Sequence, residues 1–302
     1  MSDRFFLRDF TASSLTSVEM QDIQEALSSS VQELWAMNGS MERLSGGSWY
    51  VGLGGVAATL LQIYNNQSLD AESCQKCLSL AQSLCDAAIT QLVPHPKKVT
   101  LLEGKSGLLA LSAVIHHVLR RTPQSEKDVK YIIQLLMLLM SAPTFTAVLT
   151  SRCLILIQML ESLYEAQVRA LPAGECEVLY GRSGYLSSLL FVSRHTGKAL
   201  NEEILKDILL HLIREGRDGS KALIETNACS RSDVGLYFPL MYSWHGERYL
   251  GAIHGLVGIL HTMLCAIQMS QSYEYELQAM ELAFESTRAL IQQCLPSGNL
   301  PF

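Results

Sequence analysis

Two kinds of helical segment alternate along this chain. In the first kind, apolar residues cover nearly the whole circumference of the helix, and each segment opens on a G-x-x-G pair. These apolar segments span residues 50–64, 101–119, 179–192 and 251–264. In the second kind, apolar residues recur on one face only. These amphipathic segments are predicted over Ser17–Met37, Ala71–Leu92, Glu202–Glu215 and Tyr273–Cys294.

The alternation predicts an all-α fold made of repeated helical hairpins. A helix that is apolar nearly all round has to be enclosed, whereas a helix with one polar face lies at the surface. Repeating that pair produces a ring or solenoid with the apolar helices inside and the amphipathic helices outside. No strand-like alternation of useful length competes with this interpretation.

The glycine pairs define the positions where the inner helices begin. Their first members are Gly52, Gly104, Gly181 and Gly255, and each is followed three residues later by a second glycine. We expect these glycines to let neighbouring backbones approach closely. We also expect free N–H groups at the helix starts, which would make one mouth of the ring favourable for an anion such as a carboxylate, thiolate or enolate.

The stretch from Leu135 to Leu160 carries a single charged residue, Arg152, and is long enough to span a bilayer. Pro143 and several threonines interrupt it, and a central arginine costs about 2.5–3.5 kcal/mol on insertion scales. Two buried apolar segments are therefore favoured over a transmembrane helix.

Composition narrows the class of protein. Of 302 residues, 48% are hydrophobic and 17% charged, which is ample for a large core, and the net charge is −6. No basic block with interleaved aromatics is present, so nucleic acid is not an expected partner. The amino terminus has no signal-peptide pattern, and the eight cysteines are therefore expected to be reduced thiols in the cytoplasm.

A few side chains at the helix openings are candidates for chemistry. His254 lies where a loop turns into an apolar helix. Its role is either that of an acid/base residue or that of a polar cap at the helix start. Arg182 would lie at the same mouth, holding a carboxylate or serving a structural role. Tyr249 is a packing aromatic or a proton relay. The Cys74-x-x-Cys77 pair is interpreted as buried thiols, because no second ligand pair is suitably spaced for a metal.

Several motifs carry a resemblance to a known family. They are LYGRSGY (179–185) and YLGAIHGLVGI (249–259), supported by the Arg4-Phe5-Phe6 start, the PLMYSW run before Tyr249 and the sequence LPSGNLP (295–301). Together they resemble the lanthionine synthetase C-like (LanC-like) family, with its animal branch as the nearer match. The resemblance implies an α/α toroid of seven helical hairpins.

The resemblance also implies an activity. Animal members are similar to glutathione-dependent enzymes that add the thiol to dehydroalanine or dehydrobutyrine in proteins and peptides. In the family, zinc held by two cysteines and a histidine activates the thiol. His254 then matches the catalytic proton donor or acceptor, and we assign Arg182, Tyr249 and Arg4 to substrate binding.

The sequence departs from the family at one important point. The family's zinc ligands lie in later Cys-His-Gly motifs, and this sequence matches about four of the seven repeats. We therefore expect a single partial toroid domain over residues 1–302, with a candidate insertion at 130–169, truncated at its C-terminal side. No bound metal is expected, although zinc is the cofactor of the full-length family, and thiol addition is expected to be impaired.

Two further function classes compete with impaired thiol addition. One is a non-catalytic scaffold that binds glutathione or a protein, with signalling proteins as candidate partners and membrane association at most peripheral, at the plasma membrane. The other is an α/α-barrel glycosidase, which needs two carboxylates facing the cavity. It is disfavoured because we expect the helix openings to offer only Glu103 and Glu247.

Overall fold

The computed structural model describes residues 17–36, 47–91, 98–121, 145–230, 237–270, 276–295 and 300. Arg4 and most of the first half of the 130–169 region lie outside these residues. Within the described residues the predicted all-α class is confirmed. The extended pairing found there consists of two isolated bridges, Val99 with Gly104 and Trp244 with Glu247.

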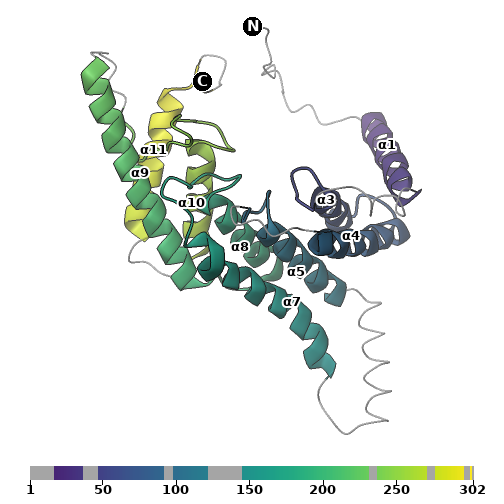
Figure 1. Cartoon of the computed structure of the whole chain (residues 1–302). Helices are drawn as coiled ribbons and strands as arrows, with labels where there is room; N and C mark the ends of the chain where they lie inside the picture. The colour runs from purple at the N-terminus through teal and green to yellow at the C-terminus, as the bar shows by residue number, and fades with distance from the viewer. Residues whose placement is uncertain are drawn as a thin grey trace.

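The helices form an arc of hairpins (Figure 1). The inner helices are α3 (Leu53–Asn65), α5 (Lys105–Arg121), α8 (Arg182–Thr196) and α10 (Leu256–Met269). The outer helices are α1 (Ser17–Ala36), α4 (Ala71–Gln91), α7 (Phe145–Leu163), α9 (Glu202–Ser230) and α11 (Glu276–Gln292). A short π-helical turn, η1 (Tyr164–Val168), extends α7. In Figure 1 the arc runs from α3 and α4 through α5 and α8 to α10 and α11.

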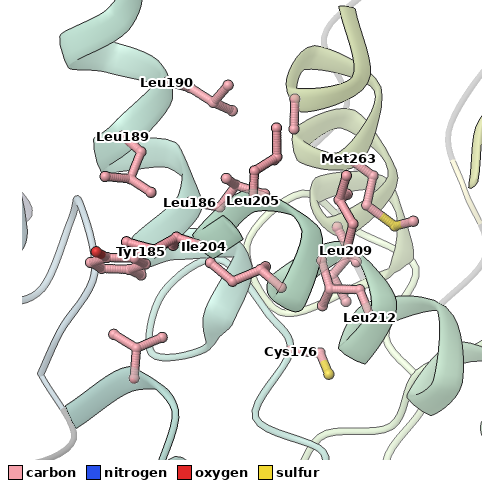
Figure 2. Close-up of a cluster of buried hydrophobic side chains, with 14 of the residues drawn as sticks. Cys176, Tyr185, Leu186, Leu189, Leu190, Ile204, Leu205, Leu209, Leu212 and Met263 are labelled. Atoms are coloured by element: carbon pink, nitrogen blue, oxygen red, sulfur yellow. The ribbon is translucent and has the colours of Figure 1, made fainter. Parts of the chain in front are cut away.

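Helix α5 lies between two hydrophobic clusters, which explains why it is apolar on nearly every side. Leu108, Leu111 and Ile115 pack with α3 and α4 in one cluster. Leu109 and Ala113 pack into the second cluster with α7, α8 and α9. Since α5 has no face directed wholly at water, its sequence shows no broad polar stripe. The same second cluster joins α8 to α9 and α10 (Figure 2).

Helix α7 takes the second half of the apolar stretch 135–160 and packs along α5. Leu156 and Leu160 are buried in the cluster that α5 and α8 share. Arg152 points away from this core and forms an ion pair with Asp86 of α4 at 3.0 Å. The expectation of a buried apolar segment is thus confirmed for α7. None of the described helices is long and apolar enough to cross a membrane.

Helix α9 is longer than the sequence predicts. The expected segment ended at Glu215, before a charged stretch with Gly216 and Gly219, but the helix runs on to Ser230. A side chain at either glycine would collide with the segment that crosses α9, since a Cβ at Gly219 would lie 2.1 Å from the carbonyl oxygen of Met241. The glycines therefore serve a tertiary crossing and do not end the helix.

The second glycine of every G-x-x-G pair serves the same purpose. A Cβ at Gly55, Gly107, Gly184 or Gly258 would lie only 1.9–2.3 Å from the carbonyl oxygen six residues upstream. The loop before each inner helix therefore folds directly onto the first turn of the helix. The prediction that these glycines allow close backbone approach is confirmed.

The expectation of free N–H groups at the helix starts is wrong for α8 and α10. In α8, the N–H groups of Arg182 and Ser183 donate to the carbonyls of Glu175 and Cys176. In α10, the N–H groups of Leu256 and Val257 donate in the same way to the preceding loop. The loops that the glycines admit satisfy these donors, so the helix starts do not form an anion site by themselves.

Hydrogen bonds between loops join the inner-helix openings in series. The backbone bonds are Trp49 N–H to Leu102 O (3.1 Å), Leu101 N–H to Gly184 O (2.9 Å) and Val178 N–H to Ile253 O (3.1 Å). The openings of α3, α5, α8 and α10 are therefore neighbours at one end of the arc.

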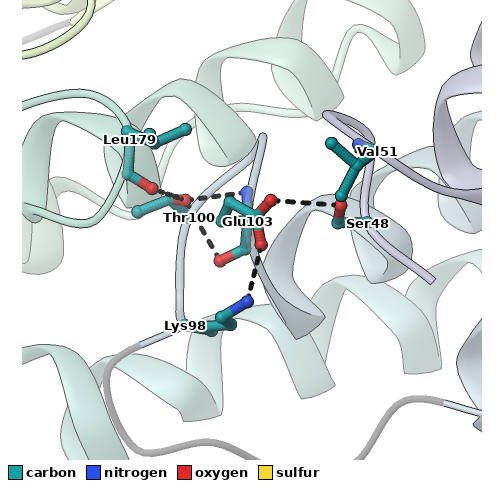
Figure 3. Close-up of polar contacts among 6 residues, drawn as sticks. All are labelled: Ser48, Val51, Lys98, Thr100, Glu103 and Leu179. Atoms are coloured by element: carbon teal, nitrogen blue, oxygen red, sulfur yellow. Dashed lines mark hydrogen bonds and ion pairs between the residues drawn. The ribbon is translucent and has the colours of Figure 1, made fainter. Parts of the chain in front are cut away.

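A polar cluster braces the middle of this series (Figure 3). The hydroxyl of Thr100 donates to Leu179 O at 2.6 Å and accepts from the Glu103 N–H at 3.1 Å. The buried Glu103 carboxylate accepts from Ser48 Oγ and pairs with Lys98 Nζ at 3.1 Å. Buried polar groups are stable only when they are paired in this way, so the cluster fixes how the neighbouring loops meet.

Candidate functional site

The candidate site is built around His254, in the loop that leads into α10. Its Nδ1 lies 2.8 Å from Oε2 of Glu177, in the loop that leads into α8. The Val178–Ile253 backbone bond joins these two loops beside the pair. The His254 side chain is 29% exposed and the Glu177 side chain 1% exposed. The imidazole can therefore be reached from solvent, whereas its partner is enclosed.

Glu177 is held as a hydrogen-bond acceptor on several sides. Its carboxylate accepts from the N–H groups of Leu179 (2.9 Å) and Tyr180, in addition to the contact with His254. Both carboxylate oxygens therefore act as acceptors for backbone donors. Since a carboxylate cannot donate, Nδ1 of His254 carries the proton. The neutral ring then presents an unprotonated Nε2 on its other edge, where it can accept a proton.

The sequence interpretation missed Glu177. Only Glu103 and Glu247 were considered as acidic residues at the helix openings. One signal was available: Glu177 lies four residues before Gly181, and its carbonyl accepts the Gly181 N–H at 3.0 Å. That position alone does not show where the carboxylate points, because its histidine partner is 77 residues away.

Aromatic rings fix the plane of the His254 imidazole. Trp244 stacks on it with 4.2 Å between ring centroids and 6° between planes. Tyr180 stacks at 6.3 Å, and Tyr249 is tilted at 6.0 Å. Trp244 is placed by a tight turn in which it exchanges backbone hydrogen bonds with Glu247. This arrangement restricts the ring to one orientation, and a protonated imidazole would also gain from the indole face.

Tyr249 lies beside His254, as expected, and its side chain is 42% exposed. Its carbonyl accepts the N–H of Leu256 at 2.9 Å, which ties it to the start of α10. Its position at the rim of the site agrees with the substrate-binding assignment, which remains a prediction. The assignment of Arg4 lies outside the described residues.

Arg182 is close in sequence to the site, but its side chain is buried and does not reach the solvent-accessible face of His254. The residue is 4% exposed, and its guanidinium donates to the carbonyls of Leu171, Pro172 and Glu175. Burial lowers the pKa of this guanidinium from its usual value. Of the two alternatives for Arg182, the geometry favours the structural role. Its predicted role in binding a substrate carboxylate is not supported.

Replacing Arg182 with methionine is expected to lower the free energy of unfolding by about 2–3 kcal/mol, because a buried arginine is removed and three loop carbonyls, among them the acceptor of the buried bond to Leu171, lose a charged donor. The matched control is Arg288→Met, since Arg288 is exposed and forms an ion pair with Glu285 on its own helix. That change should stay within about 0.5 kcal/mol. Urea unfolding followed by circular dichroism measures both. Equal effects of the two changes would contradict the structural role.

Comparison with known proteins decides the family. The model of the lanthionine synthetase C-like protein family matches residues 43–290, which include the openings of all four described inner helices. The chain belongs to the LanC-like family.

Two curated relatives match this LanC-like chain over much of its length. LanC-like protein GCL1 of Arabidopsis thaliana is 28% identical over 256 residues, covering 78% of this chain and 46% of GCL1. Glutathione S-transferase LANCL1 of Danio rerio is 28% identical over 203 residues, covering 67% of this chain and 40% of LANCL1. The chain thus spans less than half the length of these two relatives.

The residues around His254 do not fit the zinc site that the family implies. Such a site needs two thiolates and an imidazole. Within the described part of this LanC-like chain, His254 belongs to no group of three cysteine, histidine or acidic side chains close enough to share an ion. Its partner is instead a carboxylate already held by backbone donors. The described side chains around His254 therefore do not form this zinc site.

The remaining sequence candidates are structural. The carboxylate of Glu103 is paired with Ser48 and Lys98, and Glu247 is exposed on its turn. These two residues therefore do not form the pair of facing carboxylates that a glycosidase needs. Cys77 and Cys85 are buried, and burial raises the pKa of these thiols to about 11 and about 12. The interpretation of the Cys74–Cys77 pair as buried thiols is confirmed.

Proposed function

We propose that this LanC-like chain binds glutathione next to His254 and adds its thiol to dehydroalanine or dehydrobutyrine residues of peptides and proteins. The observation that carries the proposal is the His254–Glu177 pair, which provides an oriented proton acceptor on an accessible edge of the fold. The relative named glutathione S-transferase supports glutathione as the thiol. The cytoplasm, where glutathione is abundant and thiols stay reduced, is the proposed location.

The proposed addition balances without an oxidant or reductant. His254 Nε2 takes the thiol proton, and the sulfur forms a bond to the β-carbon of the dehydroamino acid. The electron pair of the carbon–carbon double bond moves to give an enolate. His254 then returns its proton to the α-carbon, which completes a thioether. Glu177 stabilises the imidazolium between these two transfers and keeps the ring in one orientation.

We propose that the reaction is slow in this chain. A free thiol has a pKa of about 8.5, so only a small share is thiolate at neutral pH. Zinc would normally raise that share, and the described surroundings of His254 have no donor set for it. The histidine then has to supply the whole activation. Arg182 is committed to loop carbonyls, so the carboxylates of glutathione must find partners elsewhere, with Arg4 still proposed as one of them.

The test uses the purified full chain, glutathione and a peptide containing dehydroalanine. Mass spectrometry is expected to show adduct formation faster than in buffer, and His254→Gln should reduce this excess rate by about 100-fold or more. The control is His261→Gln, because His261 is an exposed histidine on α10 whose ring contacts the thiol of Cys265. An excess rate that both variants leave unchanged would overturn the proposal.

A second candidate function is a non-catalytic scaffold that binds glutathione or another protein. The observation that favours it is the exposed apolar face of α11, where the side chains of Leu277, Phe284 and Ile291 are 68%, 52% and 66% exposed. Such a surface is typical of a protein contact, and signalling proteins or a peripheral site at the plasma membrane are the proposed settings. Glutathione binding without adduct formation, measured by calorimetry in the same samples, would favour this alternative.

A further inference from the structure

A second cluster, of one thiol, one imidazole and one carboxylate, lies on the other side of the loop that carries Glu177. Cys176 belongs to this loop. His211 and Glu215 lie next to it, on consecutive turns of α9. One ligand atom from each of the three side chains lies within 4.8 Å of the others. The distance from His211 Nε2 to Glu215 Oε1 is 3.9 Å. Figure 2 shows Cys176 beside the turn of α9 that carries Leu212.

The details of this cluster point to a missing partner. His211 Nε2 is buried and has no hydrogen-bond partner among the residues that the structure describes. Buried polar atoms are nearly always paired, so an unpaired imidazole nitrogen facing a carboxylate and a thiol requires a reason. Glu215 uses Oε2 to accept the N–H of Gly174 at 3.0 Å, which leaves Oε1 directed at the histidine. A backbone donor of this kind is how proteins orient ligating carboxylates.

We infer that Cys176, His211 and Glu215 bind a divalent zinc-like ion that ties the loop before α8 to α9. The ligand set of one thiolate, one imidazole and one carboxylate suits zinc, whose three-residue sites leave a fourth position to water. Bond lengths of about 2.0–2.3 Å in a tetrahedron place the ligand atoms roughly 3.3–3.7 Å apart. Side-chain movements of about 1 Å bring the three atoms to that spacing.

The surrounding charges are compatible with the ion. A thiolate and a carboxylate together balance a divalent cation, so the occupied site is neutral. Arg182 is the buried cation nearby, and its guanidinium already donates to Leu171, Pro172 and Glu175. The arginine therefore does not need Glu215 as a hydrogen-bond partner. Its charge opposes the metal at longer range, and the second anionic ligand offsets this repulsion.

The position of the site gives the ion a structural consequence. Cys176 and Glu177 are adjacent, with Cys176 directed at α9 and Glu177 directed at His254. An ion on Cys176 would hold the loop that sets the position of the Glu177 carboxylate. The inference concerns metal binding alone and does not depend on the proposed thiol addition.

The test measures zinc on the purified full chain. After loading and gel filtration, elemental analysis is expected to find about one zinc ion per chain. Cys176→Ser and Glu215→Gln should each weaken binding by more than about 100-fold in competition with a chromophoric chelator. Glu215→Gln retains an oxygen for the Gly174 N–H, so it is the variant that preserves the local fold. Cobalt loading should give a thiolate-to-cobalt charge-transfer band in the wild type that Cys176→Ser abolishes.

The control is Cys265→Ser, because Cys265 and His261 form another thiol–imidazole pair, with Sγ and Nε2 3.6 Å apart on α10. This variant is expected to retain both the zinc and the cobalt band. The inference is overturned if the wild type holds no zinc after gel filtration. It is equally overturned if Cys265→Ser loses the ion while Cys176→Ser and Glu215→Gln keep it.

Discussion

Replacing Gly258 with alanine is expected to lower the free energy of unfolding by about 3 kcal/mol. A Cβ at Gly258 would lie 1.9 Å from the carbonyl oxygen of Ala252 and 2.8 Å from a methyl group of Val178. The obstacle is backbone, so no rotamer change relieves it. The loop carrying His254 would have to move away from α10. Alanine is intrinsically the better helix former, which makes a loss of stability at this position diagnostic of the close approach.

The control for this prediction is Gly251→Ala in the same loop. No atom lies within 4 Å of a Cβ built at Gly251, and its φ is not in the left-handed region. This change should leave the free energy of unfolding within about 0.5 kcal/mol of the wild type. Urea denaturation of both variants measures the difference. If Gly258→Ala is as stable as Gly251→Ala, the close approach of loop and helix is not a feature of the folded protein.

Replacing Glu177 with glutamine is expected to reduce the proposed thiol addition by about 10²- to 10⁴-fold while leaving the fold intact. The amide oxygen, in place of Oε1, can still accept from the N–H of Tyr180, while the amide nitrogen replaces Oε2 and the Leu179 N–H loses its acceptor. The amide nitrogen then donates to Nδ1 of His254, which becomes the acceptor. This places the ring proton on Nε2, so the nitrogen that should take the thiol proton is already occupied.

Nitrogen-15 NMR of the His254 ring separates this effect from a general loss of structure. Wild type should show the proton on Nδ1, and Glu177→Gln should show it on Nε2, with matching circular dichroism. Glu247→Gln is the control: Glu247 is exposed on the neighbouring turn, where its backbone exchanges hydrogen bonds with Trp244. If the tautomer stays unchanged in Glu177→Gln, Glu177 does not position the ring. If the tautomer changes without loss of adduct formation, His254 is not the proton acceptor.

At the inner-helix openings, the sequence predicted the helix starts but not the hydrogen bonds made there. The glycine pairs and the apolar runs after them predicted where α3, α5, α8 and α10 begin. This succeeded because a G-x-x-G pair followed by a helix that is apolar on all sides is a local pattern that the fold repeats. The expected free N–H groups are paired at the starts of α8 and α10, for a reason that sequence does not reveal. The glycines let the preceding loop close over the helix start, and its carbonyls use those donors.

The site shows the same division. His254 could be named from its motif, and Tyr249 does lie beside it. Glu177 could not be named, because a buried carboxylate and a loop histidine become partners only when the openings of α8 and α10 meet. Arg182 was placed near the site by its position in the motif, but the direction of a long side chain depends on the acceptors that the fold offers. Cys176, His211 and Glu215 likewise converge only through the packing of a loop on α9.

The amino-acid sequence by itself determined the all-α class, the family and the starts of the four described inner helices, because these follow from periodicity and from local glycine patterns. The tertiary structure alone decided which side chains face one another. It turned the glycines of α9 into a crossing point, Arg182 into a clamp on loop carbonyls, and Glu177 into the partner of His254. The physical reason is that these contacts join residues distant in sequence, whose approach depends on how whole hairpins pack.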